Sequence, residues 1–491
     1  MSRNSAVLVR GNSARASTRR TGGEFRATAW LLRHPLFAFV PALVVLAVRQ
    51  WGAPAVSYGF AGLAAVLVIW WRAHPASFDR WAAPRLRSAR RRWTVYRGRR
   101  WQRVLDDCEL TRENRRTGQT LCPRVLRVRS VTPSIDTLTV RMVRGQDLQA
   151  WTDHTPALAD ALRAERVAVS RRRPSVLTVI VERRNPFPHA IDATPIPESA
   201  ADVNLCRLDV GDNEYGGPFL LNLRGKRLLV VGASGAGKSS LLWNPLRAAG
   251  PMIREGLLRV WMIDLKGGTE TDRGQALFHR WATTLDDAID LLTDFRDSMV
   301  ERQAWMRAEK VRRCEIGVDT PYELLMIDEL AMLTAYGDRS AVREALRLLA
   351  EVLTQGRASD HGVAGYVQEP TKDVVDVREL FDTRICLGVT AASHVDMALG
   401  DGARDRGALA DEIPGDPDHA GIGFVIDTGS RLPVRFRAGW VTDTDIDDLT
   451  TRCAPNQASR DDNGPDEGDV LPFPGTTHSA NGTSTSKEGV S

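Results

Sequence analysis

Two apolar runs near the N-terminus are the strongest feature of the hydrophobic pattern. They span residues 36–48 and 53–71, and between them only Arg49 and Gln50 clearly break the pattern. The second run is close to the ~20 residues that a membrane-spanning helix needs. The pattern therefore predicts a transmembrane hairpin of two helices over residues 34–72.

Arginines flank this apolar region on both sides. They lie between residues 19 and 33 before it and, more densely, between residues 72 and 100 after it. Because positive charge is retained in the cytoplasm, both flanks are predicted to be cytoplasmic, as two spans require. A cleaved signal peptide fits poorly, since the first run starts late and a second follows it, whereas a buried hairpin of a soluble protein stays an alternative. The basic stretch 85–100 could bind DNA, but its place beside the membrane favours a role in topology or in binding anionic lipid.

Beyond residue 100 the apolar positions follow the periods of strands and helices. Residues 137–143 and 175–183 read as strands and 148–167 has helical spacing, which predicts a small α/β domain. From about residue 216 short apolar strands alternate with helical stretches, which predicts a mostly parallel sheet with helices on its faces. The predicted order is a basic disordered tail (1–33), the hairpin (34–72), a basic juxtamembrane linker (73–124), the small α/β domain (125–190), a second linker (191–215), the larger α/β domain (216–445) and a disordered tail (446–491).

The composition of the chain mainly indicates the cellular compartment in which the protein resides. The hydrophobic content of 43% permits a sizeable core, and the formal net charge is +5. The cysteines are scattered and form no CxxC pair, so we expect neither a disulfide framework nor a zinc site. This cysteine usage favours a reducing compartment.

A glycine-rich motif is the clearest chemical signal. GASGAGKS fits GxxxxGK[ST], follows the apolar strand RLLVV and opens a helical stretch, which is the context of a phosphate-binding loop. We expect Lys238 to reach the β- and γ-phosphates of ATP and Ser239 to offer its hydroxyl to Mg²⁺. The predicted phosphate-binding residues are Gly232, Ala233, Ser234, Gly235, Ala236, Gly237, Lys238, Ser239 and Ser240.

A second motif indicates what the nucleotide is used for. YELLMIDE, residues 322–329, is an apolar strand that ends in two acids. Asp328 is predicted to help hold Mg²⁺, and Glu329 is placed to orient and polarise an attacking water. A carboxylate for water favours hydrolysis over phosphate transfer to a small acceptor.

Three further features are predicted to complete the site. The turn after residues 261–264 carries Asp264 and Lys266, which could lie near the nucleotide, although a plain turn is equally compatible. Gln368 ends a later strand and could sense the γ-phosphate. Arg357 lies on a glycine-flanked turn suited to reach a neighbouring subunit's nucleotide as an arginine finger, and Arg384 is the weaker candidate.

In this order the motifs resemble the FtsK/SpoIIIE family of membrane-anchored DNA translocases. The matching pieces are GASGAGKS, IDLKGG, LLMIDELAML, QGRASDHGVAGYVQEP and TRICLGV, over about residues 216–430. IDLKGG and the chain length are similar to the translocases of actinomycete conjugative plasmids and integrative elements. YVQEP keeps the glutamine of the family's ATQRP and loses its arginine, and the sequence after Trp440 is too short for the winged-helix domain that many members carry.

The resemblance implies a RecA-like P-loop ATPase over residues 216–445. It also implies a homo-hexamer around double-stranded DNA, with contacts chiefly to phosphates and little sequence preference. The resulting hypothesis is a multi-pass ATPase of the cell membrane, with its ATPase domain in the cytoplasm, that pumps double-stranded DNA in conjugative transfer. The alternatives are chromosome segregation, a type VII secretion-like motor for protein substrates, and a non-enzymatic membrane adaptor, against which the intact GKS and DE pairs argue.

Overall fold

The computed structural model describes residues 35–114, 118–334, 338–368, 370, 377–426 and 432–455, with side chains from residue 43 onward. The chain divides into two compact units, Met1–Ala83 and Pro84–Ser491. The predicted tail 1–33 lies outside the described residues, as do residues 456–491 of the predicted C-terminal tail.

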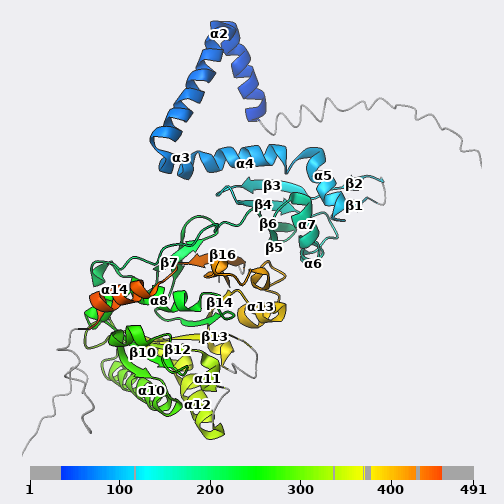
Figure 1. Cartoon of the computed structure of the whole chain (residues 1–491). Coiled ribbons are helices and arrows are strands. Elements are labelled where there is room, and N and C mark those ends of the chain that lie inside the picture. Colours follow the sequence, from blue (N-terminus) through cyan, green and yellow to red (C-terminus); the bar gives the residue numbers. More distant parts are fainter. Residues whose placement is uncertain are drawn as a thin grey trace, which may run out of the picture. The chain divides into compact units, whose positions relative to one another are not determined.

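The first unit is built around one long apolar helix. Helix α2 (Pro35–Ala73) is broken at Gly52, whose φ of 81° and ψ of 155° are not helical, so that two helical arms meet at a sharp turn (Figure 1). Glycine tolerates this positive φ because it lacks a Cβ. Among the described residues, Leu43–Ala73 is the one helical stretch long and apolar enough to cross a membrane, with a mean hydropathy of 1.8. Helix α3 (Pro75–Trp81) follows.

The second unit starts with a small α/β domain. Its sheet has the order β3-β4-β6-β5 and is antiparallel throughout. One face packs against Trp101, Leu105 and Trp151 of the covering helices. The elements of this domain are α4 (Ala83–Thr94), α5 (Gly98–Asp107), β1 (Arg112–Glu113), β2 (Thr120–Leu121), β3 (Arg124–Arg129), β4 (Ile135–Arg141), α6 (Leu148–Thr152), α7 (Thr155–Leu162), β5 (Arg166–Arg173) and β6 (Val176–Glu182).

Residues 73–124, predicted as a linker, contain helices that pack on this domain. The Ser88 hydroxyl on α4 accepts the Ser130 N–H at 2.9 Å. On α5, Trp101 Nε1 donates to the Pro123 carbonyl at 3.1 Å. The arginine-rich sequence lacks a wide apolar stripe, so its hydrophobic pattern does not reveal helices here.

The larger domain contains, within the described residues, a ten-stranded sheet of order β11-β10-β12-β13-β9-β14-β15-β16-β7-β8. Neighbours from β11 to β14 are parallel, and those from β14 to β8 are antiparallel. The strands are β7 (Leu208–Asn213), β8 (Pro218–Leu221), β9 (Arg227–Val231), β10 (Leu258–Asp264), β11 (Phe278–Ala282), β12 (Tyr322–Asp328), β13 (His361–Val367), β14 (Thr383–Leu387), β15 (Ile422–Ile426) and β16 (Pro433–Ala438).

The antiparallel half departs from the predicted organisation. Within the stretch GIGFVID, Ile422–Ile426 form β15, which pairs antiparallel with β14 rather than parallel. Strand β7 falls in the predicted linker 191–215, and the predicted domain end at residue 445 lies inside the last helix. A period-2 pattern identifies a strand but does not give its direction, which tertiary pairing decides.

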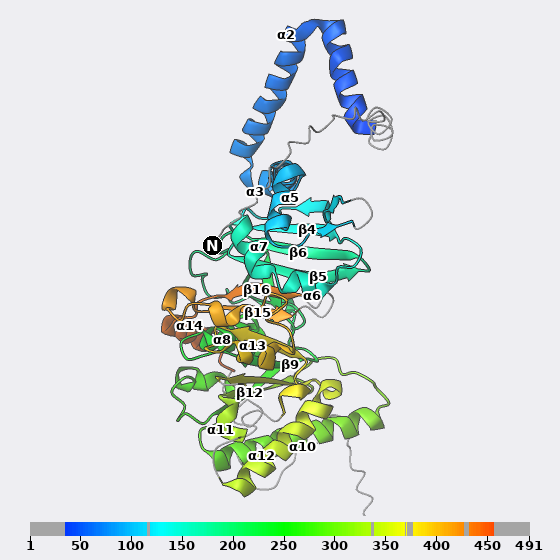
Figure 2. The ribbon, with the colours of Figure 1, turned by 90° about the vertical axis from the view of Figure 1, so that its right-hand side faces the viewer.

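Alternate residues of each central strand enter two separate apolar layers. Leu229 and Val231 of β9 pack with the helices α10 to α13, whereas Leu228 and Val230 pack with α8, α9 and α14. The sheet is thus covered on both faces, as a buried parallel sheet requires (Figures 1 and 2). The helices are α8 (Lys238–Ala248), α9 (Gly250–Arg254), α10 (Leu285–Ala308), α11 (Leu330–Thr334), α12 (Arg339–Gln355), α13 (Ala392–Leu399) and α14 (Asp443–Cys453).

A buried ion cluster fastens the small domain to the larger one. Arg166 on β5 donates to Glu182 and to the Gly407 carbonyl, both at 2.7 Å, and it also pairs with Glu214. Arg435 on β16 pairs with Glu182 from the other side. Because a buried charge is tolerated only when its partners are in place, this cluster fixes one relative placement of the two sheets.

Candidate nucleotide-binding site

The GASGAGKS segment forms a tight loop between β9 and α8. Gly235 and Gly237 have φ angles of 76° and 95°, which disfavour residues with a Cβ. A Cβ on Gly237 would lie 2.4 Å from the Gly421 nitrogen, and the Gly421 N–H donates to the Ala236 carbonyl at 2.9 Å. The first N–H groups of α8 have no carbonyl within the helix to bind. The loop therefore has the backbone shape and dipole of an anion-binding site.

The two functional side chains of this loop form hydrogen bonds to other groups of the protein. Lys238 donates from Nζ to the carbonyls of Gly232 at 2.8 Å and Ala233 at 2.9 Å. Burial lowers the pKa of Lys238, and the nearby Glu329 opposes this shift. The Ser239 hydroxyl donates to Glu270 at 2.9 Å.

The strand that ends in the acid pair lies close to this loop. Strand β12 is separated from β9 by β13 alone, so its carboxyl end faces the same edge of the sheet. Asp328 pairs in register with Asp264 of β10. Burial raises the pKa of Asp328, and Lys266, 3.3 Å from its carboxylate, opposes this shift. Lys266 also lies 3.4 Å from Glu329, so its single ammonium group is shared by both acids of the pair.

The turn after β10 therefore belongs to the site. Asp264 accepts the Lys266 N–H at 3.1 Å and the Thr271 hydroxyl at 2.9 Å, and so braces both ends of the loop. Trp281 Nε1 donates to the same Thr271 hydroxyl at 3.0 Å. Gly268, with a φ of 76°, is packed so closely that a Cβ would lie 2.5 Å from the Trp281 ring. These contacts give the loop a defined shape that presents Lys266 to the acids.

Glu329 has an unusual backbone conformation. Its φ of 63° places it in the left-handed region, which is uncommon for a residue with a side chain. Its carboxylate accepts the Gln368 N–H at 3.2 Å, so it reaches across to the end of β13. Strain of this kind is concentrated at functional sites, where surrounding contacts hold it in place.

A cavity of about 300 Å³ lies beside the phosphate-binding loop. Its walls come from the loop itself, from residues 388–390 and from residues 411–420, and its polar side chains are Ser234, Thr390, Asp411, Asp416 and His419. The Ala233 N–H donates to the Gly388 carbonyl at 2.8 Å, which joins one wall to the loop. The volume is within the range of small-ligand pockets, and the position suits the nucleoside of a bound nucleotide.

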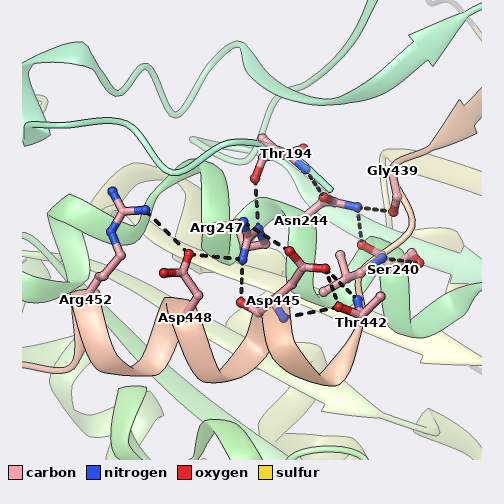
Figure 3. A network of polar contacts seen from close by, with 10 residues as sticks. Thr194, Ser240, Asn244, Arg247, Gly439, Thr442, Asp445, Asp448 and Arg452 are labelled. Carbon is pink, nitrogen blue, oxygen red and sulfur yellow. Dashed lines mark hydrogen bonds and ion pairs between the residues drawn. The ribbon is translucent and has the colours of Figure 1, made fainter. Parts of the chain in front are cut away.

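Polar contacts behind the loop fix helix α8 to the C-terminal segment (Figure 3). Asn244 donates to the Gly439 carbonyl at 2.7 Å and accepts the Thr194 N–H at 2.8 Å. Arg247 donates to the Thr194 carbonyl at 2.9 Å and pairs with Asp445 of α14 at 3.5 Å. The helix that begins with the functional lysine is thus held on a rigid support.

Ser240 belongs to this support through its side chain. Its hydroxyl accepts the Val441 N–H at 3.5 Å, and its carbonyl accepts the Asn244 side chain at 2.8 Å. The hydroxyl therefore lies on the face of α8 turned toward the C-terminal segment. A contact of Ser240 with phosphate stays a prediction. The backbone N–H of Ser240, and not its hydroxyl, would make this contact.

The structure places the two arginine candidates apart from the other predicted residues. Arg357 is exposed on the turn before β13, at the amino ends of the parallel strands, whereas the phosphate-binding loop and the acids lie at the carboxyl ends. Arg384 in β14 pairs with Glu379 at 2.9 Å near the same amino edge. Neither arginine is part of the site formed within one chain, and a role toward a neighbouring subunit stays a prediction.

Sequence reasoning missed Glu270 and the cavity walls. Glu270 is an acid in a polar loop, and no spacing marks it as a partner of Ser239. Residues 411–420 form no regular motif. They reach the loop only because β14 pairs with β9, and β15 pairs with β14. Long-range pairing of this kind leaves no local pattern.

The phosphate-binding loop after β9 and the acid pair at the end of β12, two places away in the sheet, define a P-loop ATPase domain. Residues 199–400 match the model of the FtsK/SpoIIIE family.

Comparison with curated proteins finds no significant match. Among solved structures, the chain is similar to TcpA, the pCW3 conjugation coupling protein, solved as a monomer with ATPγS, with 18% identity, a TM-score of 0.46 and coverage of 67% of this chain and 93% of that one. It is also similar to the cytoplasmic domain of the Thermomonospora curvata type VII secretion ATPase EccC, with 21% identity, a TM-score of 0.42 and coverage of 55% and 33%. The genome packaging NTPase B204 of Sulfolobus turreted icosahedral virus 2, in complex with AMPPCP, gives 14% identity, a TM-score of 0.29 and coverage of 44% and 98%.

Proposed function

We propose that this chain is a membrane-anchored ATPase that translocates double-stranded DNA, in conjugative transfer. The observation that carries the proposal is the FtsK/SpoIIIE domain over residues 199–400, whose site joins Lys238, Ser239, Asp328 and Glu329 at one edge of the sheet. The conjugative role rests on the likeness of IDLKGG to the transfer proteins of actinomycete elements.

The residues at this edge fit MgATP. The phosphate-binding loop has no room for an added Cβ at Gly232 or Gly237, and Ser239 and Asp328 offer the oxygen ligands that Mg²⁺ prefers. Bound Mg²⁺ would neutralise charge on the phosphates. Lys238 would release the loop carbonyls and turn to the phosphates, Glu329 would orient and polarise water, and Gln368 would report on the γ-phosphate.

The membrane anchor is proposed to be the two arms of α2. The break at Gly52 lies between the apolar runs, and arginines flank both ends of the helix. Positive flanks favour a cytoplasmic position for both ends, so both arms would cross the bilayer. A reporter fused after residue 50 is expected to lie outside the cytoplasm, and a cytoplasmic signal would overturn the two-span model.

The active assembly is proposed to be a ring, a homo-hexamer around the duplex. Arg357 is exposed at the edge of the sheet opposite the nucleotide groups of its own chain, so its side chain is accessible to a neighbouring subunit. Contacts of such a channel would be chiefly to phosphates, so DNA binding should weaken steeply with salt.

The test is ATP hydrolysis by the full chain in lipid nanodiscs, with and without duplex DNA. We expect duplex DNA to raise the rate and Lys238→Ala to abolish it, with Lys310→Ala as the exposed-lysine control. An unchanged rate with DNA would contradict the translocase proposal, and hydrolysis by Lys238→Ala would contradict the site assignment. Stimulation by a secreted protein instead of DNA would favour the type VII-like alternative, and the neighbouring genes would separate conjugation from chromosome segregation.

A further inference from the structure

Helix α4 has an inner face that is fixed to the small domain. Arg87 donates to the Val131 carbonyl at 2.6 Å, and Ser88 accepts the Ser130 N–H at 2.9 Å. Arg91 lies 3.8 Å from Asp136 of β4. Position 91 is three and four residues after positions 88 and 87, so the three contacts define one side of the helix and leave the opposite side outward.

The outward side combines an apolar stripe with arginines. Leu86 and Trp93 are each 52% exposed, and Ala89 lies between them at helical spacing. The guanidinium group of Arg97 stacks on the Trp93 ring, with 4.0 Å between Cζ and the ring centroid. By helical spacing, arginines flank this stripe on both sides at positions 85, 90 and 92.

The charged residues of α4 and of the sequence next to it are all arginines. From Arg80 to Leu105 the sequence contains many arginines and neither aspartate nor glutamate. A partner that covers the face has to be anionic, and it also has to accept two large apolar side chains.

We propose that the outward face of α4 docks on an anionic lipid surface, with Leu86 and Trp93 at the level of the headgroups and the flanking arginines on lipid phosphates. The proposal rests on the membrane anchor proposed above. Helix α2 ends at Ala73 and α4 begins at Ala83. Ten residues extend at most about 35 Å, so α4 cannot move far from the bilayer that α2 would cross.

The apolar stripe distinguishes this surface from a site for nucleic acid. A duplex presents phosphates that the arginines alone would satisfy, and it offers Leu86 and Trp93 nothing to bury against. An interfacial helix has this arrangement, with an apolar face in the headgroup region and cationic side chains beside it. Because α4 is fixed to the small sheet, docking would orient the small domain on the membrane, and the Arg166 cluster would pass that orientation to the ATPase domain.

The test is hydrogen exchange of the full chain in nanodiscs of phosphatidylcholine alone or mixed with phosphatidylglycerol. We expect amides of residues 84–94 to exchange more slowly with the anionic lipid and the difference to vanish at high salt. Arg90→Gln with Arg92→Gln should weaken docking roughly 30-fold, since each arginine near an anionic surface contributes roughly fivefold. Leu86→Ser with Trp93→Ser should also remove the protection. The exposed pair Arg339→Gln with Arg343→Gln on α12 is the matched control and should change nothing.

Equal exchange in the two lipid mixtures would overturn the proposal. So would protection of α4 by duplex DNA in neutral nanodiscs, or protection that depends on protein concentration and not on lipid charge, as a second copy of the chain would produce. Failure of the anchor is seen separately, because the chain would then not incorporate into neutral nanodiscs. Failure of the motor is seen in the ATPase assay.

Discussion

The two edges of the parallel half of the large sheet use charge in different ways. At the carboxyl edge the charged groups share partners: Lys266 contacts two carboxylates, and Lys238 rests on backbone carbonyls. At the amino edge one ion pair is deeply buried and matched. Arg302, with a side chain 3% exposed, lies 3.3 Å from Glu323, which is 2% exposed.

The buried pair is surrounded by further fixed contacts. Trp261 Nε1 donates to Glu323 at 2.7 Å, and Arg302 donates to the carbonyls of Pro321 and Ser359. Burial raises the pKa of Glu323, which Arg259 and Arg302 oppose. A charge whose partners are all supplied by the fold helps to hold the fold together. A charge whose partners can be replaced by a ligand is available to bind that ligand. Burial alone does not separate the two edges, because Asp328 is also buried.

The largest expected effect comes from a variant at the amino edge, which tests whether this edge contributes to the nucleotide site of a neighbouring subunit. Arg357→Ala should lower hydrolysis roughly 1,000-fold if the guanidinium stabilises charge in the adjacent subunit's site. Its thermal stability should not change, since the side chain is exposed. Mixing Arg357→Ala with Glu329→Gln subunits should restore part of the activity, which neither variant has alone. Arg343→Ala, another exposed arginine, is the control, and full activity of Arg357→Ala would remove this residue from the mechanism.

Arg302→Met should destabilise the chain by about 3–5 kcal/mol, because it leaves Glu323 buried without its ion pair. The measurement is the thermal midpoint of unfolding. Arg347→Met breaks exposed pairs with Glu344 and Glu351 and should cost less than about 1 kcal/mol. Equal losses of stability in the two variants would show that the buried ion pair contributes no more to folding than the exposed pairs do.

Glu329→Gln should reduce hydrolysis roughly 100-fold and leave ATP binding intact, since the amide cannot act as a base. The readouts are turnover and the affinity for a fluorescent ATP analogue. Glu309→Gln, an exposed acid at the end of α10, is the control. Loss of binding together with turnover would make Glu329 a structural residue like Glu323.

His361 provides a pH test of the amino edge. Burial lowers the pKa of His361 from 6.5 to about 3, so the neutral ring is stabilised by folding. The unfolded chain binds the proton first, and this contribution is therefore complete above pH 6.5 and is lost as the pH falls toward 3. The slope is at most about 1.4 kcal/mol per pH unit. His361→Gln should remove this pH-dependent contribution. The difference in thermal midpoint between the variant and the parent chain should therefore shrink as the pH falls from 6.5 to 4. A constant difference would contradict this assignment.

The smallest effect concerns the partner of Ser239. Glu270→Ala removes the hydrogen-bond acceptor of that hydroxyl and should raise the Mg²⁺ concentration needed for ATP binding roughly fivefold. The measurement is a Mg²⁺ titration of nucleotide binding. Asp272→Ala, an exposed acid two residues later, should leave the titration unchanged. An identical response from both variants would mean that Glu270 does not position Ser239.

The sequence predicted the parts of this fold that have local signatures. The apolar strands β9, β10, β12 and β13 are read directly from short runs, and the GKS and DE motifs mark their functional ends. The antiparallel half was not predicted, because β7 and β16 recognise each other only in the folded chain. Glu270 and Arg166 were missed for the same reason, since their roles come from partners distant in the sequence.

The pairing of β7 with β16 also affects how the chain is made. Phe436 lies opposite Asn213, so the sheet that carries the phosphate-binding loop is completed only after nearly all of the domain has left the ribosome. Contacts this distant in sequence form slowly, and a partly made domain exposes apolar strand edges meanwhile. The apolar helix α2 is synthesised well before this closure. The helix proposed above as the membrane anchor is therefore available to the bilayer before the ATPase domain is complete.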